Sequence, residues 1–153
     1  MGKLAEEGHA SITVAAEPDA VWAVVTDPTR LGEWFSETVD ADWTGRWNDI
    51  AVGARFSGTN EIGRISSFRI NEVTECDPPH VFAWRVIPSG LYPDSTLWRV
   101  VCTPAAAGTE VELSFEVLRL NAVLGWWLRR FAPQRRHRVD ALDGDLRRLA
   151  ALV

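Results

Sequence analysis

The chain has 153 residues, of which 46% are hydrophobic and 24% charged, and its formal net charge is −5. These values are typical of a globular domain with a substantial core, and they argue against disorder. The negative charge, without any helix-turn-helix, zinc-finger or aromatic RNA-binding signature, excludes general nucleic-acid binding.

The charge is unevenly distributed along the chain. Residues 119–153 carry eight arginines and three aspartates, whereas the rest carries eight basic and eighteen acidic residues. The N-terminal residues have no hydrophobic signal core, and the apolar stretch 120–128 is too short to span a bilayer. Cys76 and Cys102 form no disulfide framework and are expected to be reduced thiols. We therefore expect a cytoplasmic protein.

The first part of the chain predicts one strand followed by two short helices. Residues 9–15 alternate polar with apolar, which indicates a strand with one buried face. Pro18 suits the first turn of a helix, in which apolar residues of 20–25 recur at helical spacing. Asp27-Pro28 ends that helix, because the residue before a proline avoids the α region. Residues 31–35 then predict the second short helix.

The middle of the chain predicts consecutive strands separated by turns. The expected strands cover residues 38–43, 54–60, 65–74, 81–87, 95–103 and 110–117. Short turns between consecutive strands favour an antiparallel meander. Arg69 and Arg85 alternate with apolar residues, so we place both on the solvated outer face.

The last stretch is predicted to be helical, with an interruption. Apolar residues of 120–131 follow three- and four-residue spacing, Pro133 predicts a kink or break, and the stripe resumes over 139–153. Only this element is long enough to cover the apolar face of the sheet. The expected fold is α+β: a curved antiparallel sheet of six to seven strands, two short helices after the first strand, and a long C-terminal helix across the sheet. No repeat or linker interrupts the chain, so we expect a single domain over residues 1–153 with an ordered core from about residue 9.

Four segments in this order resemble a known superfamily. They are AEPDAVWAVVTDP (16–28), LGEWF (31–35), VGARFSGTN (52–60) and DPPHVFAW (77–84). They are similar to the first helix, the second helix, the third strand, and the hairpin with the fifth strand of the START-like helix-grip superfamily (SRPBCC), in its polyketide cyclase/dehydrase branch. The resemblance covers nearly the whole chain. It implies a helix-grip fold with a cavity for lipids, polyketides or other apolar small molecules, and it fixes no reaction.

Aromatic residues dominate the predicted inner face. The chain has eight tryptophans, and Trp84 and Trp98 fall on inward positions of central strands. Trp34 and Phe35 are expected at the open end, as a lid or rim. Asn60 shares a face with Phe56, and its amide suits a ligand carbonyl or hydroxyl. Plain core packing, or a turn role for Asn60, is the alternative. The predicted ligand-binding residues are Trp34, Phe35, Phe56, Asn60, Phe68, Trp84, Trp98, Phe115 and Trp127.

No catalytic set emerges from the sequence. A nucleophile needs a histidine within reach, and no histidine falls on a predicted inward face or has metal-ligand spacing. The acids nearest the predicted pocket are Glu61, Glu72 and Asp94, and solvated surface positions are expected for each. We therefore predict no catalytic residue, metal or cofactor.

The basic aromatic segment 126–138 is the most unusual stretch. Trp126, Arg129 and Arg130 are suited to an anionic membrane surface. An amphipathic helix that pairs with the acidic body, or a homodimer contact through Trp126, is the alternative.

The sequence favours a protein that binds or carries a small apolar molecule (a lipid, a polyketide, or another aromatic or isoprenoid compound) in a cavity between the sheet and the C-terminal helix. A polyketide cyclase or aromatase that acts by positioning its substrate is one alternative. A membrane-surface interaction module is the other.

Overall fold

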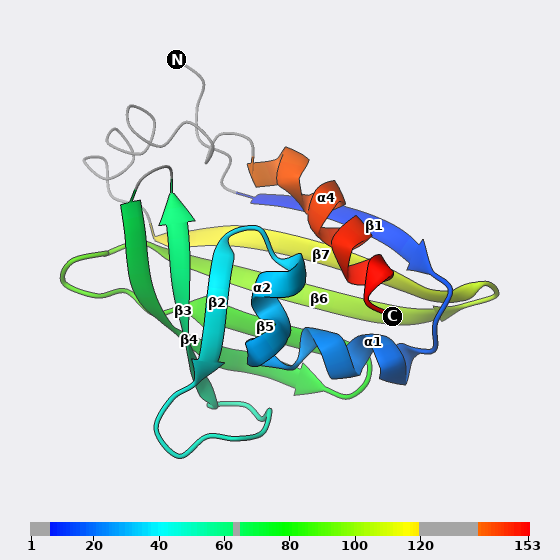
Figure 1. The fold of residues 1–153 in the computed structure, drawn as a ribbon, viewed down its shortest axis with the longest axis horizontal. Helices are drawn as coiled ribbons and strands as arrows, with labels where there is room; N and C mark the ends of the chain where they lie inside the picture. The colour runs from blue at the N-terminus through cyan, green and yellow to red at the C-terminus, as the bar shows by residue number, and fades with distance from the viewer. Residues whose placement is uncertain (1–6, 63–64, 120–137) are drawn as a thin grey trace.

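One seven-stranded antiparallel sheet organises the computed structural model, which describes residues 7–62, 65–119 and 138–153 (Figure 1). The strands are β1 (Glu7–Val14), β2 (Thr38–Trp43), β3 (Arg55–Ile62), β4 (Ile65–Asp77), β5 (Val81–Val86), β6 (Ser95–Ala105) and β7 (Gly108–Arg119). Their order across the sheet is β1-β7-β6-β5-β4-β3-β2. The meander from β2 to β7 agrees with the sequence analysis, and β1 pairs with β7 at the far edge.

The described helices lie on one face of this sheet (Figure 1). They are α1 (Pro18–Val25), the 3-10 helix η1 (Pro28–Arg30), α2 (Leu31–Trp34) and α4 (Arg138–Ala151). Pro18 occupies the first turn of α1, and the Asp27 carboxylate accepts from the Thr29 N–H at 3.0 Å to cap η1. The predicted helix-grip α+β fold is thus confirmed.

Helix α4 covers the sheet with a single apolar stripe. Leu142, Leu146 and Leu149 are buried at helical spacing, whereas Val139 and Val153, which the sequence analysis placed on the same stripe, are exposed. The helical pattern of residues 120–131 lies outside the described residues. Within the described ranges, no helix combines the length and apolarity needed to cross a bilayer.

A glycine brings α2 into direct contact with β2. A Cβ atom on Gly32 would lie 2.2 Å from the Val39 carbonyl oxygen, so a larger residue cannot occupy this position. This close approach fixes the short connection between α2 and β2, residues 34–38, against the rest of the fold. We call it the 34–38 segment.

Candidate functional site

A continuous aromatic layer lines the inner face of the central strands. Trp84 on β5 lies directly opposite Trp98 on β6, and their rings stack with centroids 6.3 Å apart. Phe115 on β7 extends the layer beyond Trp98 at 5.3 Å, and Phe56 on β3 extends it beyond Trp84 at 6.3 Å. Strand alternation places all four side chains on one face, as the sequence analysis predicted.

The 34–38 segment adds a fifth ring on top of this layer. Phe35 packs edge-on against Trp98 at 4.6 Å and against Trp84 at 5.7 Å, and Trp34 lies 5.5 Å from Phe35. Phe35 and Trp34 are 3% and 1% exposed, so both are part of the interior, whereas the sequence analysis expected a lid or rim. Six of the predicted ligand-binding residues therefore form one cluster.

Phe68 does not join this cluster, which corrects the sequence analysis. Its side chain is 66% exposed on the outer face of β4, and the buried positions of that strand are Ser67, Arg69, Asn71 and Val73. Arg69, expected in solvent, is 5% exposed. The alternation of apolar and polar residues along β4 does not show which side chains face inward, because the inward polar side chains have hydrogen-bond partners on other elements.

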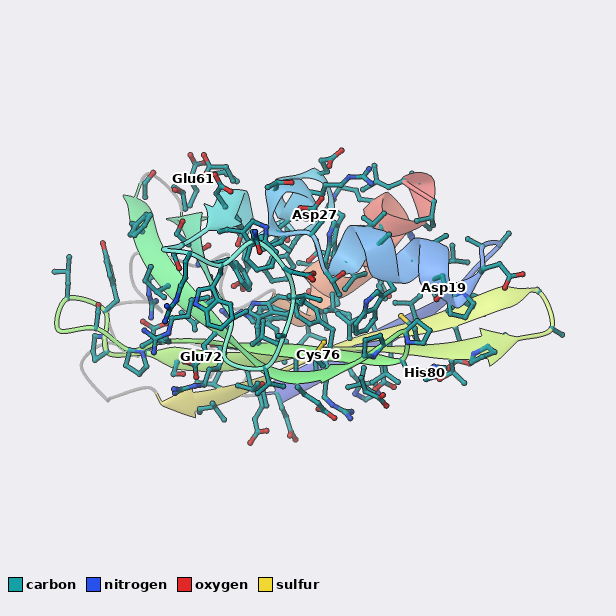
Figure 2. All side chains as sticks on the ribbon, turned by 90° about the horizontal axis from the view of Figure 1, so that it is seen from below. Asp19, Asp27, Glu61, Glu72, Cys76 and His80 are labelled. Carbon is teal, nitrogen blue, oxygen red and sulfur yellow. The ribbon has the colours of Figure 1, made fainter. Side chains whose placement is uncertain are left out.

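One crevice against the aromatic layer is lined by described residues alone, and it is small. This crevice between α1, η1 and the rings of Phe56, Phe82 and Trp84 has a volume of about 10 Å³. That is room for one water molecule at most. From the edge, side chains occupy the layer between sheet and helices (Figure 2). The space in which we expected an apolar hollow is occupied in part by the ring of Phe35.

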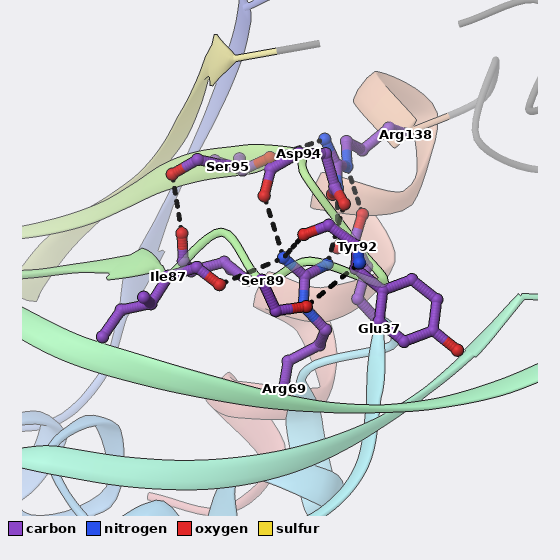
Figure 3. A network of polar contacts seen from close by, with 10 residues as sticks. Glu37, Arg69, Ile87, Ser89, Tyr92, Asp94, Ser95 and Arg138 are labelled. Carbon is purple, nitrogen blue, oxygen red and sulfur yellow. Dashed lines mark hydrogen bonds and ion pairs between the residues drawn. The ribbon is translucent and has the colours of Figure 1, made fainter. Parts of the chain in front are cut away.

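Arg69 is the centre of a polar cluster beside the aromatic layer (Figure 3). Its guanidinium donates to the Asp94 carboxylate at 3.0 Å and to the carbonyl oxygens of Asp94, Tyr92 and Ile87 at 2.8, 3.4 and 3.4 Å. The guanidinium carbon also lies 5.4 Å from the centre of the Tyr92 ring. Arg69 therefore fastens the β5–β6 connection to the inner face of β4.

Arg138, the first residue of α4, lies where the polar and aromatic parts meet. It is 6% exposed, and its guanidinium carbon lies 5.2 Å from the Trp98 ring centre and 5.1 Å from that of Phe115. Its Nε and Nη2 both donate to the Glu37 carboxylate, the latter at 2.9 Å. Its Nη1 approaches Thr96 Oγ1 at 3.4 Å. A planar, charged donor on two aromatic faces is suited to carboxylate recognition.

Polar contacts hold the 34–38 segment to α4 and to β3. Arg148 Nε donates to the Trp34 carbonyl oxygen at 3.2 Å, and the Ser36 N–H donates to Asp145 at 3.2 Å. At the other end, Thr38 Oγ1 donates to the Asn60 side-chain oxygen at 2.9 Å. The half-buried Asn60, a predicted ligand-binding residue, therefore uses its amide oxygen to anchor this segment.

One buried donor in this region lacks a partner. The indole Nε1 of Trp34 is buried and has no hydrogen-bond partner among the described residues. A buried N–H left unsatisfied costs about 1–3 kcal/mol.

The described part of the chain contains no evident nucleophile–base pair. Burial raises the pKa of the Cys102 thiol to about 11, so this sulfur stays protonated at neutral pH. Figure 2 shows His80 and Glu61 at opposite ends of the molecule. Glu72 pairs with Arg55 and Arg85. No three His, Cys, Asp or Glu side chains in these ranges cluster as metal ligands would.

A second depression lies by the edge strand β1 and also reaches Phe115 of β7 and Val139 of α4. It has a volume of about 720 Å³, is open to solvent, and is lined mainly by polar residues of β1, β6 and β7 such as Glu7, Arg99, Glu112 and Glu116. Its polar, open character does not suit an apolar ligand. Among the sites predicted from sequence, Trp126, Trp127, Arg129 and Arg130 lie outside the described residues.

Comparison with known proteins agrees with the geometry. A family described as "Polyketide cyclase / dehydrase and lipid transport" matches residues 6–153. Protein MLL2253 from Mesorhizobium loti has a similar structure, with a TM-score of 0.68, 16% identity and 95% of each chain covered.

Two further solved structures are similar in fold. Major latex-like protein 151 from Panax ginseng has a TM-score of 0.67 at 14% identity, with 95% of each chain covered. The Polyketide_cyc-like protein Cgl2372 from Corynebacterium glutamicum has a TM-score of 0.57 at 24% identity, with 95% of this chain and 88% of that chain covered. No curated protein matches the chain.

Proposed function

Because the chain belongs to the polyketide cyclase/dehydrase and lipid transport family, we propose that it binds a small apolar molecule between the inner face of the sheet and α4. The lipid, polyketide, aromatic and isoprenoid compounds expected from sequence all fit this class. The observation that carries the proposal is the aromatic layer of Trp84, Trp98 and Phe115, on which Phe35 rests edge-on. Flat aromatic walls favour rings and hydrocarbon chains.

Phe35 occupies the position that a ligand ring would take. It comes from a short connection, not from the sheet, and its ring packs edge-on against Trp84 and Trp98. A bound molecule would replace the Phe35 ring on these two tryptophans, and the binding-competent arrangement is the one with Phe35 displaced. The measured affinity is then reduced by the fraction of molecules in which Phe35 still occupies the site.

Removal of the Phe35 ring should therefore strengthen binding. We expect Phe35→Ala to bind 2-naphthylmethanol, a neutral bicyclic probe, about tenfold more tightly than the wild type, because no side chain competes for the site. Isothermal titration calorimetry measures the change. Phe68→Ala is the matched control, since Phe68 is 66% exposed on the outer face, and it should bind as the wild type does. Equal, negligible binding by the wild type and Phe35→Ala would refute the proposal.

A further inference from the structure

The buried cation Arg138 is neutralised by a carboxylate that belongs to the same segment as Phe35. Glu37 accepts two hydrogen bonds from the guanidinium, and Phe35 lies 4.6 Å from the Trp98 ring on which that guanidinium also rests. One residue separates Phe35 from Glu37 in the chain. The 34–38 segment thus presents a ring and a carboxylate to adjoining parts of one site.

We propose that the molecule bound in this site is an apolar carboxylic acid, whose carboxylate replaces Glu37 on Arg138 while its apolar body replaces Phe35 on Trp98. This inference rests on the proposed function and names its ligand class. The 34–38 segment, in this view, is an internal substitute for the ligand. Figure 3 shows Glu37 and Arg138 joined at the start of α4.

Charge balance is the physical reason for the choice of an acid. Arg138 is 6% exposed, and a buried guanidinium without a counter-ion is strongly unfavourable. Displacement of Phe35 draws Glu37 away, because the two belong to one short segment. A neutral ligand leaves Arg138 without its carboxylate, whereas an acid supplies a new one in the same bidentate geometry.

The second buried arginine does not serve this role. Arg69 already donates to the Asp94 carboxylate and to three carbonyl oxygens. Those partners belong to the β5–β6 connection and not to the segment that carries Phe35. A ligand carboxylate that replaced the partners of Arg69 would release that connection without opening the aromatic layer. Arg138 is therefore the residue that binds the carboxylate of the acid.

Two probes that share one bicyclic ring system and differ in charge distinguish recognition of the carboxylate from binding of the apolar rings. At neutral pH, 2-naphthoic acid is ionised and 2-naphthylmethanol is neutral. Calorimetry gives the ratio of their dissociation constants, and the wild type should prefer the acid. Glu37→Gln should increase that preference by about tenfold, because the variant leaves the positive charge of Arg138 without an internal carboxylate.

Two variants and a control complete the test. Arg138→Met keeps an unbranched apolar chain over Trp98 and should abolish the preference for the acid. Glu37→Gln keeps the size of the side chain, so it tests the inference even if Arg138→Met does not fold. Glu72→Gln is the matched control, since Glu72 pairs with Arg55 and Arg85 on the outer face, and it should leave the preference unchanged.

The outcomes distinguish this inference from the proposed function. Acid preference in the wild type that rises in Glu37→Gln and is unchanged in Glu72→Gln supports the inference. Equal binding of both probes, with a ratio that Glu37→Gln does not move, overturns it and leaves the proposed function standing. Failure of both probes to bind the wild type and Phe35→Ala overturns both.

Discussion

At the scale of single residues, the two buried arginines differ in what holds their charge. Arg69 is bonded to one carboxylate and three carbonyl groups of a single connection, while Arg138 depends on one carboxylate and lies on two aromatic rings. The first arrangement stabilises the fold. For the second, we propose that a ligand carboxylate replaces Glu37 on Arg138.

Arg69→Met should strongly destabilise the protein. The substitution removes the arginine that pairs with the Asp94 carboxylate, whose side chain is 10% exposed, and that donates to three carbonyl oxygens. Removing one partner of a buried ion pair costs about 3–5 kcal/mol in the free energy of unfolding. Urea denaturation followed by tryptophan fluorescence measures the change.

Arg85→Met is the matched control for that substitution. The Arg85 side chain is 39% exposed and pairs with Glu72 at 3.4 Å, so its loss should cost less than about 1 kcal/mol. Equal losses of stability in the two variants would contradict the structural role of Arg69.

Residue patterns in the sequence were informative where a strand buries apolar side chains. The inward positions of Trp84, Trp98 and Phe115 were predicted correctly because alternation on β5, β6 and β7 follows burial. Phe68 and Arg69 were not, because on β4 the polar residues face inward and their partners come from a distant connection. Neither Asp94 as the partner of Arg69 nor Glu37 as the partner of Arg138 is marked by any local sequence signal.

At the scale of elements, α4 holds the 34–38 segment by its polar side chains. Arg138 binds Glu37, Asp145 accepts from the Ser36 N–H, and Arg148 donates to the Trp34 carbonyl oxygen. The apolar stripe of α4 was readable from sequence, but these contacts were not, because they join residues about a hundred positions apart. The burial of Trp34 and Phe35 follows from them.

The buried carboxyl of Asp145 gives this contact a defined pH dependence. Burial raises the pKa of Asp145 above its ordinary value of 3.8, although Ser36 and Arg148 act in the opposite direction. The folded state therefore binds this proton more tightly than the unfolded state. Protonation of Asp145 therefore favours the folded state. The contribution of Asp145 to the free energy of unfolding should rise as the pH falls from above the raised pKa toward 3.8.

Comparison with Asp145→Asn isolates this effect. Urea denaturation between about pH 7 and pH 4 should show the wild type gaining stability relative to Asp145→Asn as the pH falls. Asp143→Asn, at an exposed position of the same helix, controls for the loss of a carboxylate from α4. A wild type that loses stability relative to Asp145→Asn as the pH falls would contradict the assignment.

At the scale of the whole molecule, the fold was largely predictable because its elements follow one another with clear periodicity. The order of one strand, two short helices, a meander and a terminal helix is the order observed. The interior could not be predicted in the same way. The ring of Phe35 lies on Trp84 and Trp98 between the sheet and the helices, and no periodic pattern in the sequence predicts this position.

Intermolecular nuclear Overhauser effects between labelled protein and unlabelled 2-naphthylmethanol show whether the probe lies on the aromatic layer. We predict contacts from the probe to the ring protons of Trp84 and Trp98, which are both 1% exposed while Phe35 lies on them. Contacts confined to outer-face residues such as Leu97 and Phe68 would contradict it, because the molecule would then bind the wrong side of the sheet.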